Sequence, residues 1–288
     1  MAQIIAIANQ KGGTGKTTTT LNLGAALREM GNRVLLIDMD PQASLTLAMG
    51  LDPDELETTI YTALRNVVEA GEMSSQEVIV TTDEGLDLIP ANIELSQADL
   101  DLVREPLGVY ALRDVLSPIT GAYDYILVDC PPSLGILTTN GLAAAHQVII
   151  PLQADYLALK GVNLLLRTIT KIQRRANRRL QIAGVLLTMA DLRTLHAREI
   201  IDTTRKAFDE RVPVFKTLIK MSVRLKEAPI AGQSILAYAD DTAGAVAYRE
   251  LAREFTAQFL PTTPRAGPAP AHSADETKEA VTEVPENG

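Results

Sequence analysis

The stretch that decides the fold is Asn9–Thr20, NQKGGTGKTTTT, which directly follows the apolar run Ile4–Ala8. Its glycines, Gly12, Gly13 and Gly15, allow backbone conformations that other residues rarely adopt, so successive N–H groups can turn inward around an anion. A helix starting just after the last glycine would add its positive N-terminal end. We favour a phosphate-binding loop over a purely structural turn, because strand, glycine-rich loop and helix occur together in the right order.

The residue types in this loop indicate a nucleotide with its metal ion. Lys16 can reach the β- and γ-phosphates, and the hydroxyl of Thr17 is placed to bind Mg²⁺. We expect the nucleotide to be contacted by Lys11, Gly12, Gly13, Thr14, Gly15, Lys16, Thr17 and Thr18. The ordinary motif G-x-x-x-x-G-K-[ST] has a glycine where this chain has Gln10. The strict motif therefore fails, and the lysine that follows Gln10 needs its own explanation.

Short apolar runs alternate with helical patterns along the rest of the chain. The runs are bounded by polar or turn residues, as is typical of strands covered on both faces; they are Ile4–Ala8, Val34–Ile37, Leu86–Ile89, Tyr125–Val128, Val148–Pro151 and Ile182–Leu187. The candidate helices are Lys16–Met30, Ile93–Val103, Tyr110–Leu116, Leu159–Arg174, His196–Phe208 and Thr242–Phe259. This alternation predicts an α/β fold with a mostly parallel twisted sheet, helices on both faces, and ligands at the carboxyl ends of the strands.

Length and composition favour one domain with a tail. The chain has 288 residues, 46% hydrophobic and 22% charged, which is enough for one substantial core. We predict a single domain over residues 1–260. Residues 261–288 are rich in Pro, Ala, Thr and Glu and contain few large apolar side chains. We therefore expect them to form a disordered acidic tail.

Several classes of protein are disfavoured by the same composition. Cys130 is the only cysteine, which excludes a disulfide framework and a metal site built from several cysteines of one chain. The N-terminus lacks the basic and long apolar regions of a secretory signal, and no apolar run reaches membrane-spanning length. We expect a soluble cytoplasmic protein without a membrane partner.

The charges are unevenly distributed. The net charge is −9, yet residues 160–226 contain 16 Lys and Arg against 5 Asp and Glu, and the remainder contains 11 against 31. The densest part is Lys171–Arg179, KIQRRANRR, which alone would be interpreted as a solvated helix end. An excess of positive charge spread over the whole segment attracts the negative phosphate backbone of nucleic acid, so nucleic acid is a candidate ligand. With 4% aromatic residues and no tryptophan, duplex is favoured over single strands.

Several motifs together carry a family resemblance. Lys11–Thr17, KGGTGKT, resembles the deviant Walker A loop of the ParA/MinD class of P-loop ATPases, in which the early lysine is the signature residue. Asp38–Gln42 and Asp129–Ser133 resemble the switch I and switch II segments of that class. Thr188–Thr194 and Val223–Pro229 resemble stretches of its chromosome-partitioning branch, ParA/Soj. The similarity runs from about residue 2 to about residue 258.

This resemblance implies a single P-loop NTPase domain that hydrolyses ATP slowly with Mg²⁺. Asp40 and Asp129 both follow apolar strands, so their carboxylates should lie at the same sheet edge as the loop. Mg²⁺ takes one or two carboxylates and keeps several waters. We interpret Asp129 as a carboxylate that holds Mg²⁺ through water, and Asp40 as a contact to Mg²⁺ or to the attacking water. Asp38 is left off the catalytic set, because a helix N-cap is a competing interpretation.

The resemblance also gives Lys11 a role. In the family, this lysine is understood to cross a dimer interface and contact the phosphates bound by the partner subunit, which adds charge stabilisation to phosphoryl transfer. Lys11, Lys16 and Asp40 are therefore the expected catalytic residues, within an ATP-dependent homodimer. The spacing alone leaves open that Lys11 serves its own nucleotide or only keeps the loop soluble.

The same branch implies ATP-dependent, non-specific binding to double-stranded DNA and association with the nucleoid. Arg193 and Arg224 match arginines implicated in DNA contact, and Lys220 is a further candidate. Relatives commonly carry Ile-Pro-Arg-Asn where this chain has Ile-Lys-Met-Ser at 219–222, so the local loop and one DNA contact are in doubt. Met189 is expected beside the adenine, although a core methionine explains it equally well.

The partner and cargo complete the prediction. A ParB-like protein with a short basic segment would stimulate hydrolysis and release the ATPase from DNA, and the cargo could be a chromosome, a plasmid or a protein assembly on the nucleoid. A MinD-like membrane-cycling ATPase is less favoured, because the tail lacks a large apolar face. A nitrogenase-type reductase would need more cysteines than the single one present. A signalling GTPase is disfavoured because the Asn-Lys-x-Asp guanine motif is absent. A metabolic P-loop ligase or kinase remains open in principle.

Overall fold

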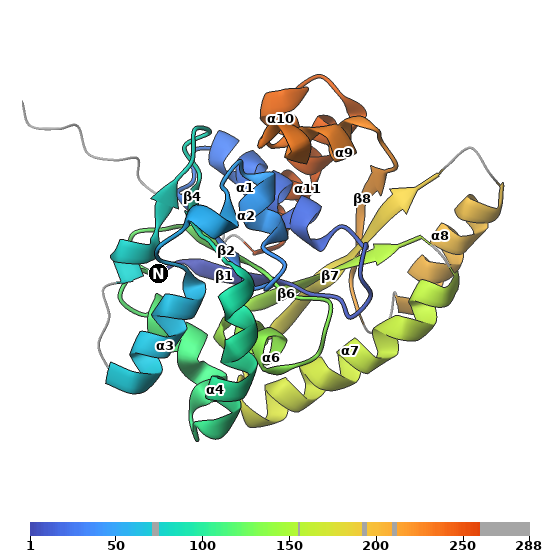
Figure 1. Cartoon of the computed structure of the whole chain (residues 1–288). Coiled ribbons are helices and arrows are strands. Elements are labelled where there is room, and N and C mark those ends of the chain that lie inside the picture. Colours follow the sequence, from blue (N-terminus) through green and yellow to red (C-terminus); the bar gives the residue numbers. More distant parts are fainter. Residues whose placement is uncertain (71–74, 155, 192–194, 209–211, 260–288) are drawn as a thin grey trace, which may run out of the picture.

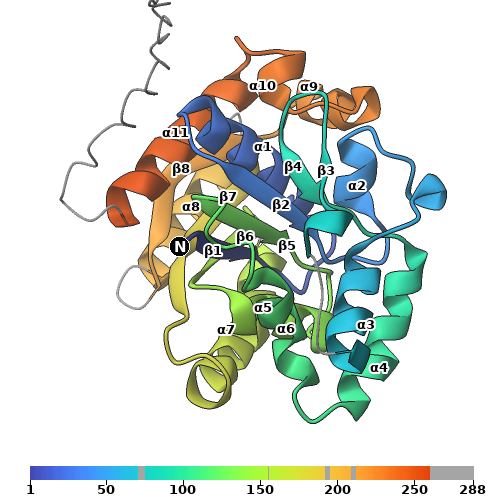
Figure 2. The same cartoon turned by 90° about the vertical axis from the view of Figure 1, so that its left-hand side faces the viewer.

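The computed structural model (Figures 1 and 2) describes residues 1–70, 75–154, 156–191, 195–208 and 212–259. Its strands form one sheet in the order β3-β4-β2-β5-β1-β6-β7-β8. All neighbours run parallel except the antiparallel pair β3 and β4. The strands are β1 (Gln3–Ile7), β2 (Val34–Asp38), β3 (Val80–Thr81), β4 (Asp87–Ile89), β5 (Tyr125–Asp129), β6 (Gln147–Gln153), β7 (Gln181–Ala190) and β8 (Val214–Lys220).

Helices cover both faces of this sheet. The α-helices are α1 (Lys16–Glu29), α2 (Ser44–Ala48), α3 (Ile60–Ala70), α4 (Ala98–Arg104), α5 (Ala111–Leu116), α6 (Ile136–Ala144), α7 (Tyr156–Arg175), α8 (Leu195–Phe208), α9 (Arg224–Glu227), α10 (Ile235–Tyr238) and α11 (Ala243–Phe259). Short 3₁₀ turns cover Pro53–Glu55, Ser75–Val78, Ile93–Gln97, Gly108–Tyr110 and Ala228–Ala231. No helix of the described residues is both long and apolar enough to cross a membrane.

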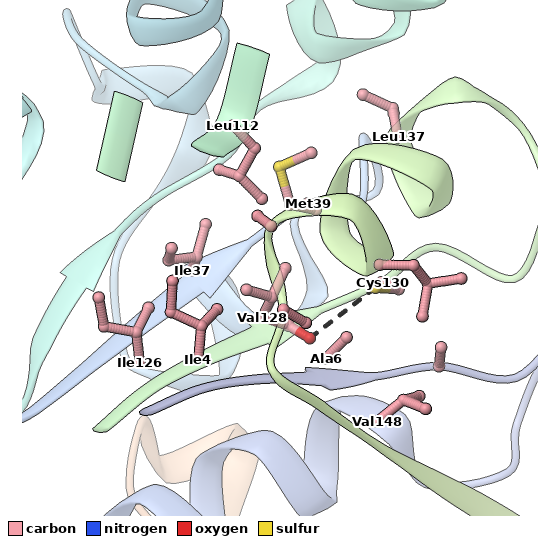
Figure 3. Packing of buried hydrophobic residues seen from close by; sticks show 14 of the residues in the cluster. Ile4, Ala6, Ile37, Met39, Leu112, Ile126, Val128, Cys130, Leu137 and Val148 are labelled. Atoms are coloured by element: carbon pink, nitrogen blue, oxygen red, sulfur yellow. Dashed lines mark hydrogen bonds between the residues drawn. The ribbon is translucent and has the colours of Figure 1, made fainter. Parts of the chain in front are cut away.

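The sheet separates two apolar cores. One contains side chains of α1, α2, α10 and α11, and the other contains side chains of α3 to α8. Figure 3 shows part of the second core, where residues of β1, β2 and β5 pack together with Leu112 of α5 and Leu137 of α6. Strands buried on both faces explain why the central runs of sequence are almost continuously apolar.

The α/β fold expected from the sequence is confirmed, and each expected strand and helix is present with shifted ends. β8 was missed because it is an edge strand whose side chains alternate between buried and exposed, so it contains no continuous apolar run. α6 was missed because almost all of it is buried, which removes the polar face of an amphipathic helix. α3 was missed although Ile60, Ala63 and Leu64 bury an ordinary helical stripe. The expected tail, residues 261–288, lies outside the described residues.

The carboxylate of Glu254 covers part of the free edge of β8. Its Oε1 accepts a hydrogen bond from the N–H of Lys216 (2.6 Å), and its Oε2 accepts from the N–H (3.0 Å) and hydroxyl (2.8 Å) of Thr217. An edge strand otherwise presents unpaired N–H groups that invite pairing with another chain. Glu254 therefore joins α11 to the outermost strand and satisfies these donors.

Replacing Glu254 by alanine should destabilise the fold by about 1–3 kcal/mol, because hydrogen bonds to a charged group are lost. Urea unfolding of both variants measures this loss. Glu250→Ala is the matched control, since Glu250 is exposed on the same helix. Equal unfolding midpoints for the two variants would contradict the role given to Glu254.

Candidate functional site

The strand register brings the predicted residues to one sheet edge. β5 lies between β1 and β2, with Asp129 level with Ile7 on one side and with Asp38 on the other. The glycine-rich loop leaves β1 two residues after Ile7. The carboxylates of β2 and β5 and the loop therefore meet at the carboxyl ends of three adjacent central strands.

The loop adopts the conformation that its glycines predict. Gly13 and Gly15 have φ angles of 70° and 84°, in the left-handed region that favours glycine. Gly15 precedes the first residue of α1, so the positive end of that helix opens toward the loop. The Lys16 side chain is buried, and its Nζ donates a hydrogen bond of 3.5 Å to the carbonyl oxygen of Lys11. Lys16 thus lies across the concave side of its own loop.

Two side chains that the sequence did not single out hold the loop in place. Asn9 is buried; its Nδ2 donates to the carbonyl oxygen of Pro151 (2.6 Å), and its Oδ1 accepts from the N–H of Lys11 (3.1 Å). Thr188, at the far end of β7, donates its hydroxyl to the carbonyl oxygen of Thr14 (2.8 Å). With this carbonyl turned toward Thr188, the loop conformation is fixed by β6 and β7 as well as by its glycines.

The Asp129 carboxylate is a buried acidic group in direct contact with the first turns of α1. It is 1% exposed and accepts hydrogen bonds from the hydroxyls of Thr17 (2.6 Å) and Thr20 (3.4 Å). Burial, and next the charge of Asp38, raise its pKa well above the usual value, while Thr17 and Lys16 act in the opposite direction. The structure therefore joins two predicted metal ligands, Thr17 and Asp129, directly.

Asp40 and Asp38 have different environments. Asp40 is half-buried; its N–H donates to Asp38 Oδ1 (3.1 Å), and its own Oδ1 accepts from the N–H of Gln42 (3.0 Å). Asp38 is fully buried and its Oδ2 accepts from the N–H (2.9 Å) and hydroxyl (2.8 Å) of Thr46. Burial raises the pKa of Asp38 to about 6 against these hydrogen bonds. Asp38 thus anchors the segment that carries Asp40 and accepts from an N–H in the first turn of α2, although Ala43 occupies the N-cap position of that helix.

The donor set at this edge suits a hard divalent cation. Burial lowers the pKa of Lys16, and the charges of Asp129 and Asp40 oppose this shift, which indicates that these groups share one electrostatic environment. The oxygens of Thr17 and Asp129 are in contact, and Mg²⁺ prefers oxygen ligands. Across the part of the chain that the structure describes, no three His, Cys, Asp or Glu side chains could hold a metal by themselves.

The two lysines of the loop have unlike surroundings. Lys11 is exposed, and its Nζ donates to the side-chain oxygen of Gln153 (3.3 Å) at the end of β6. Gly12 is exposed beside it, and a Cβ added there would meet Pro132 at 4.0 Å. Lys16 is 7% exposed. The charge of Lys11 therefore lies on the outer side of the loop, at the surface of the carboxyl edge.

A mainly apolar pocket opens beside the loop. Its lining includes Gly15 and Thr18 of the loop and α1, together with Met189, Ile219, Lys220, Met221, Leu225 and Tyr248. Met189 has a φ angle of 53°, unusual for a residue other than glycine, at the point where β7 passes the loop. The position of this pocket next to a phosphate-binding loop suits the flat base of a nucleotide. Met221, one of the residues in the stretch 219–222 that depart from the family pattern expected from the sequence, also lines it.

The predicted DNA-binding residues lie at this same edge as far as the structure describes them. Lys220 ends β8 and Arg224 begins α9, and both side chains are exposed. Arg224 pairs with Glu227 at 3.0 Å. Arg193 lies outside the described residues.

Comparison with known proteins places this chain in a family. The model of a family described as AAA domain matches residues 2–182. The chain is 44% identical to the sporulation initiation inhibitor protein Soj of Bacillus subtilis, over 89% of this chain and 99% of that protein. It is 41% identical to the chromosome partitioning protein ParA of Myxococcus xanthus, over 92% of each chain.

Solved structures share the fold. A crystal structure described as cobyrinic acid a,c-diamide synthase from Mycobacterium smegmatis, with bound ATP analogue and magnesium, is 41% identical with a TM-score of 0.76 and covers 88% of this chain and 93% of that one. A plasmid partition protein described as putative, from Borrelia burgdorferi and bound to AMPPNP, is 26% identical with a TM-score of 0.72, over 90% of this chain and all of that one. Nucleotide with magnesium is thus bound within this group of structures.

Replacing Thr188 by valine should weaken nucleotide binding by roughly 3- to 10-fold, because a net hydrogen bond of about 1 kcal/mol to the loop is lost without a change in shape. Titration with a fluorescent ATP analogue measures the affinity, and Thr188→Ser should restore it. Thr204→Val is the control, since Thr204 is also buried and donates to a carbonyl, but within α8. An unchanged affinity in Thr188→Val would contradict the positioning role.

Proposed function

This chain belongs to the ParA/Soj family of partitioning ATPases, and we propose that it works as an ATP-gated dimer that binds duplex DNA without sequence preference. The observation that carries the proposal is the contrast between the two loop lysines. Lys16 is buried across its own loop, whereas Lys11 lies exposed on the outside of that loop. Lys11, which donates to Gln153 in this structure, lies where it can reach a nucleotide bound by another subunit.

Within one subunit, the residues of the carboxyl edge have separate tasks. Lys16 and the N–H groups of the loop bind and orient the phosphates. Thr17 and, through water, Asp129 would hold Mg²⁺, which when bound neutralises phosphate charge, and Asp40 lies on the segment from which a carboxylate can orient water. Met189 and the pocket beside the loop accept the adenine, a location supported by Gly15 and Thr18 in the same lining.

Across the dimer, Lys11 would contact the phosphates of the partner's ATP. Phosphoryl transfer gains mainly from charge placed around the transferred group, and a cation can come from outside the site. Gly12 supports close approach, because it adds no side chain at the exposed surface of the loop. ATP then bridges the two subunits, and its hydrolysis removes the bridge.

The proposal of DNA binding is supported by the position of the basic side chains at the carboxyl edge of the sheet. Lys220 and Arg224 are exposed at the same edge as the nucleotide, so a dimer formed through this edge brings both copies of them together. Non-specific affinity depends on counterion release and grows with the number of phosphates neutralised. Arg193, outside the described residues, is proposed as part of the same surface. The exposed Met221 replaces one arginine common in relatives, so we expect fewer contacts here.

We propose that a ParB-like partner stimulates hydrolysis through a basic segment, which would suit the acidic remainder of the chain, with its 31 Asp and Glu against 11 Lys and Arg outside residues 160–226. The cargo is a chromosome or plasmid, and a protein assembly on the nucleoid is the alternative. A peptide of such a segment that leaves ATP turnover unchanged in the presence of DNA would contradict the partner hypothesis. Stimulation by DNA also discriminates this function from a synthase activity, such as the one named for the M. smegmatis structure.

DNA retention by the wild type should be higher with ATP than with ADP or without nucleotide, and the gain with ATP should disappear in Lys11→Ala. The reason is that the variant binds nucleotide through Lys16 but lacks the cation that joins the subunits. Retention of fluorescent duplex on immobilised protein, with nucleotide affinity measured in parallel, tests this. Lys16→Ala is the control that should lose nucleotide binding itself. Equal retention of wild type in all three conditions would refute the switch.

A further inference from the structure

A cluster of arginines lies at the end of α7 and in the turn that leads into β7. It consists of Arg174, Arg175, Arg178 and Arg179, here called the arginine turn, and all four side chains are exposed. None of them takes part in the nucleotide site described above. The sequence places them in the same basic segment as Lys220 and Arg224, without showing whether the two groups share a surface.

The structure separates the arginine turn from the nucleotide edge. One residue, Leu180, separates the turn from Gln181, which begins β7 and is level with Gln147, the first residue of β6. Lys220 instead ends the neighbouring parallel strand β8. The ten residues of β7 span roughly 33 Å. In Figure 1, α7 runs from the side of the phosphate loop to the opposite side, and Figure 2 looks onto that opposite edge, where β1 begins.

The backbone of the turn is fixed by side chains that are not basic. Asn177 Nδ2 donates to the carbonyl oxygens of Leu142 (3.1 Å) and Ala145 (2.6 Å), and its Oδ1 accepts from the N–H of Arg179 (3.2 Å). Gln173 Nε2 donates to the carbonyl oxygen of Leu180 (2.9 Å). The turn is therefore held against the end of α6, and its guanidinium groups are presented from a preorganised backbone.

The charges of the turn are not neutralised within the described residues. The ion pairs found there involve other arginines, namely Arg33, Arg65, Arg113, Arg224 and Arg249. Cations in the last turn of a helix are stabilised by its dipole, which accounts for Arg174 and Arg175. Arg178 and Arg179 lie beyond the helix end, where this effect does not explain them.

We propose that the arginine turn is a second contact for the backbone of duplex DNA, one that does not depend on bound nucleotide. Guanidinium groups match phosphate oxygens in a planar fork, which favours a phosphate ligand. A protein partner would instead need an apolar centre. The exposed large apolar side chains of the described chain lie elsewhere, and Leu164 on the same helix is about three turns away from Arg174.

This contact rests on the proposed function only for its ligand, DNA. Because the turn is fixed by Asn177 and Gln173 and lies far from the loop, it has the same geometry with or without ATP. In a dimer joined through the carboxyl edges, the two arginine turns face away from the interface and stay accessible. The ATPase then keeps a weak hold on DNA after hydrolysis, while the nucleotide edge supplies the switchable part of the affinity.

The test is binding of a fluorescent 30-base-pair duplex to the full chain without nucleotide, measured by anisotropy over a series of salt concentrations; the duplex length is about that of three helical turns. Arg178→Gln/Arg179→Gln should weaken binding by at least about 10-fold at the lowest salt, and should lower the slope of log K against log salt by about 2, one for each phosphate contact. Arg65→Gln/Arg104→Gln changes the net charge equally at exposed arginines of α3 and α4 and should have little effect. Thermal unfolding confirms that both variants fold, and Arg174→Gln/Arg175→Gln provides a second test of the cluster.

Equal weakening in the two matched variants would overturn the proposal, because net charge alone would then account for the binding. It would also be overturned if poly-glutamate of the same charge competed as well as DNA, since the turn would then be a site for acidic polypeptides. Addition of ATP in the same titration keeps the two hypotheses apart. If ATP gives no further gain while the arginine turn still matters, the proposed switch fails and this inference stands. If ATP raises the DNA affinity and the two matched double variants bind DNA equally, the proposed switch stands and this inference fails.

Discussion

The buried carboxylate of Asp129 is the constraint on which the rest of the carboxyl edge depends. A carboxylate that is 1% exposed needs hydrogen-bond donors or cations, and here they come from the first turns of α1: the hydroxyls of Thr17 and Thr20 and the ammonium group of Lys16. This pairing fixes how α1 approaches β5, and the approach sets the position of the glycine-rich loop. Asp38, buried on the next strand, raises the pKa of Asp129 further, so the edge favours an additional positive charge. A nucleotide-bound Mg²⁺ supplies such a charge, which links the architecture of the sheet to the chemistry of its ligand.

The same sheet gives the molecule two edges of different character. At the carboxyl edge, the loop, Lys11, Lys220 and Arg224 lie together, so binding of ATP and exposure of cations to DNA can be coupled through dimer formation. At the amino edge, the arginine turn is held by Asn177 against the end of α6 and is separated from the loop by the length of β7. An affinity that responds to nucleotide and one that does not can therefore coexist in one chain. Such a division would keep the protein near DNA between cycles of ATP binding and hydrolysis.

The sequence was sufficient to predict the parts of the site that have a local signature. The spacing of Lys11, Lys16 and Thr17, and the acidic residues that follow apolar runs, were recognisable because each motif is contiguous. Asn9, Thr20 and Thr188 could not be found in this way, because their hydroxyl and amide groups acquire a purpose only when Pro151, Asp129 and Thr14 are brought beside them. The same limit applies to charge: an excess of cations over residues 160–226 gave no indication that β7 divides them between opposite edges. β8 was not predicted because its side chains alternate between buried and exposed at the edge of the sheet, so it has no continuous apolar run of the kind that marks the central strands.

The central claim is that Lys11 serves the nucleotide of the other subunit, and a mixture of two inactive variants tests it most directly. Lys11→Ala and Asp40→Ala each keep Lys16 for nucleotide binding, and each alone should hydrolyse little ATP. If Lys11 acts across the interface, a mixed dimer contains one complete site, made of Asp40 from one subunit and Lys11 from the other. ATP turnover of an equal mixture should then rise above that of either variant alone, toward roughly a quarter of the wild-type rate, the value reached when subunits pair at random, so that half of the dimers are mixed and each has one active site. No recovery, in a mixture shown to form mixed dimers, would mean that Lys11 acts on its own nucleotide and would contradict the account.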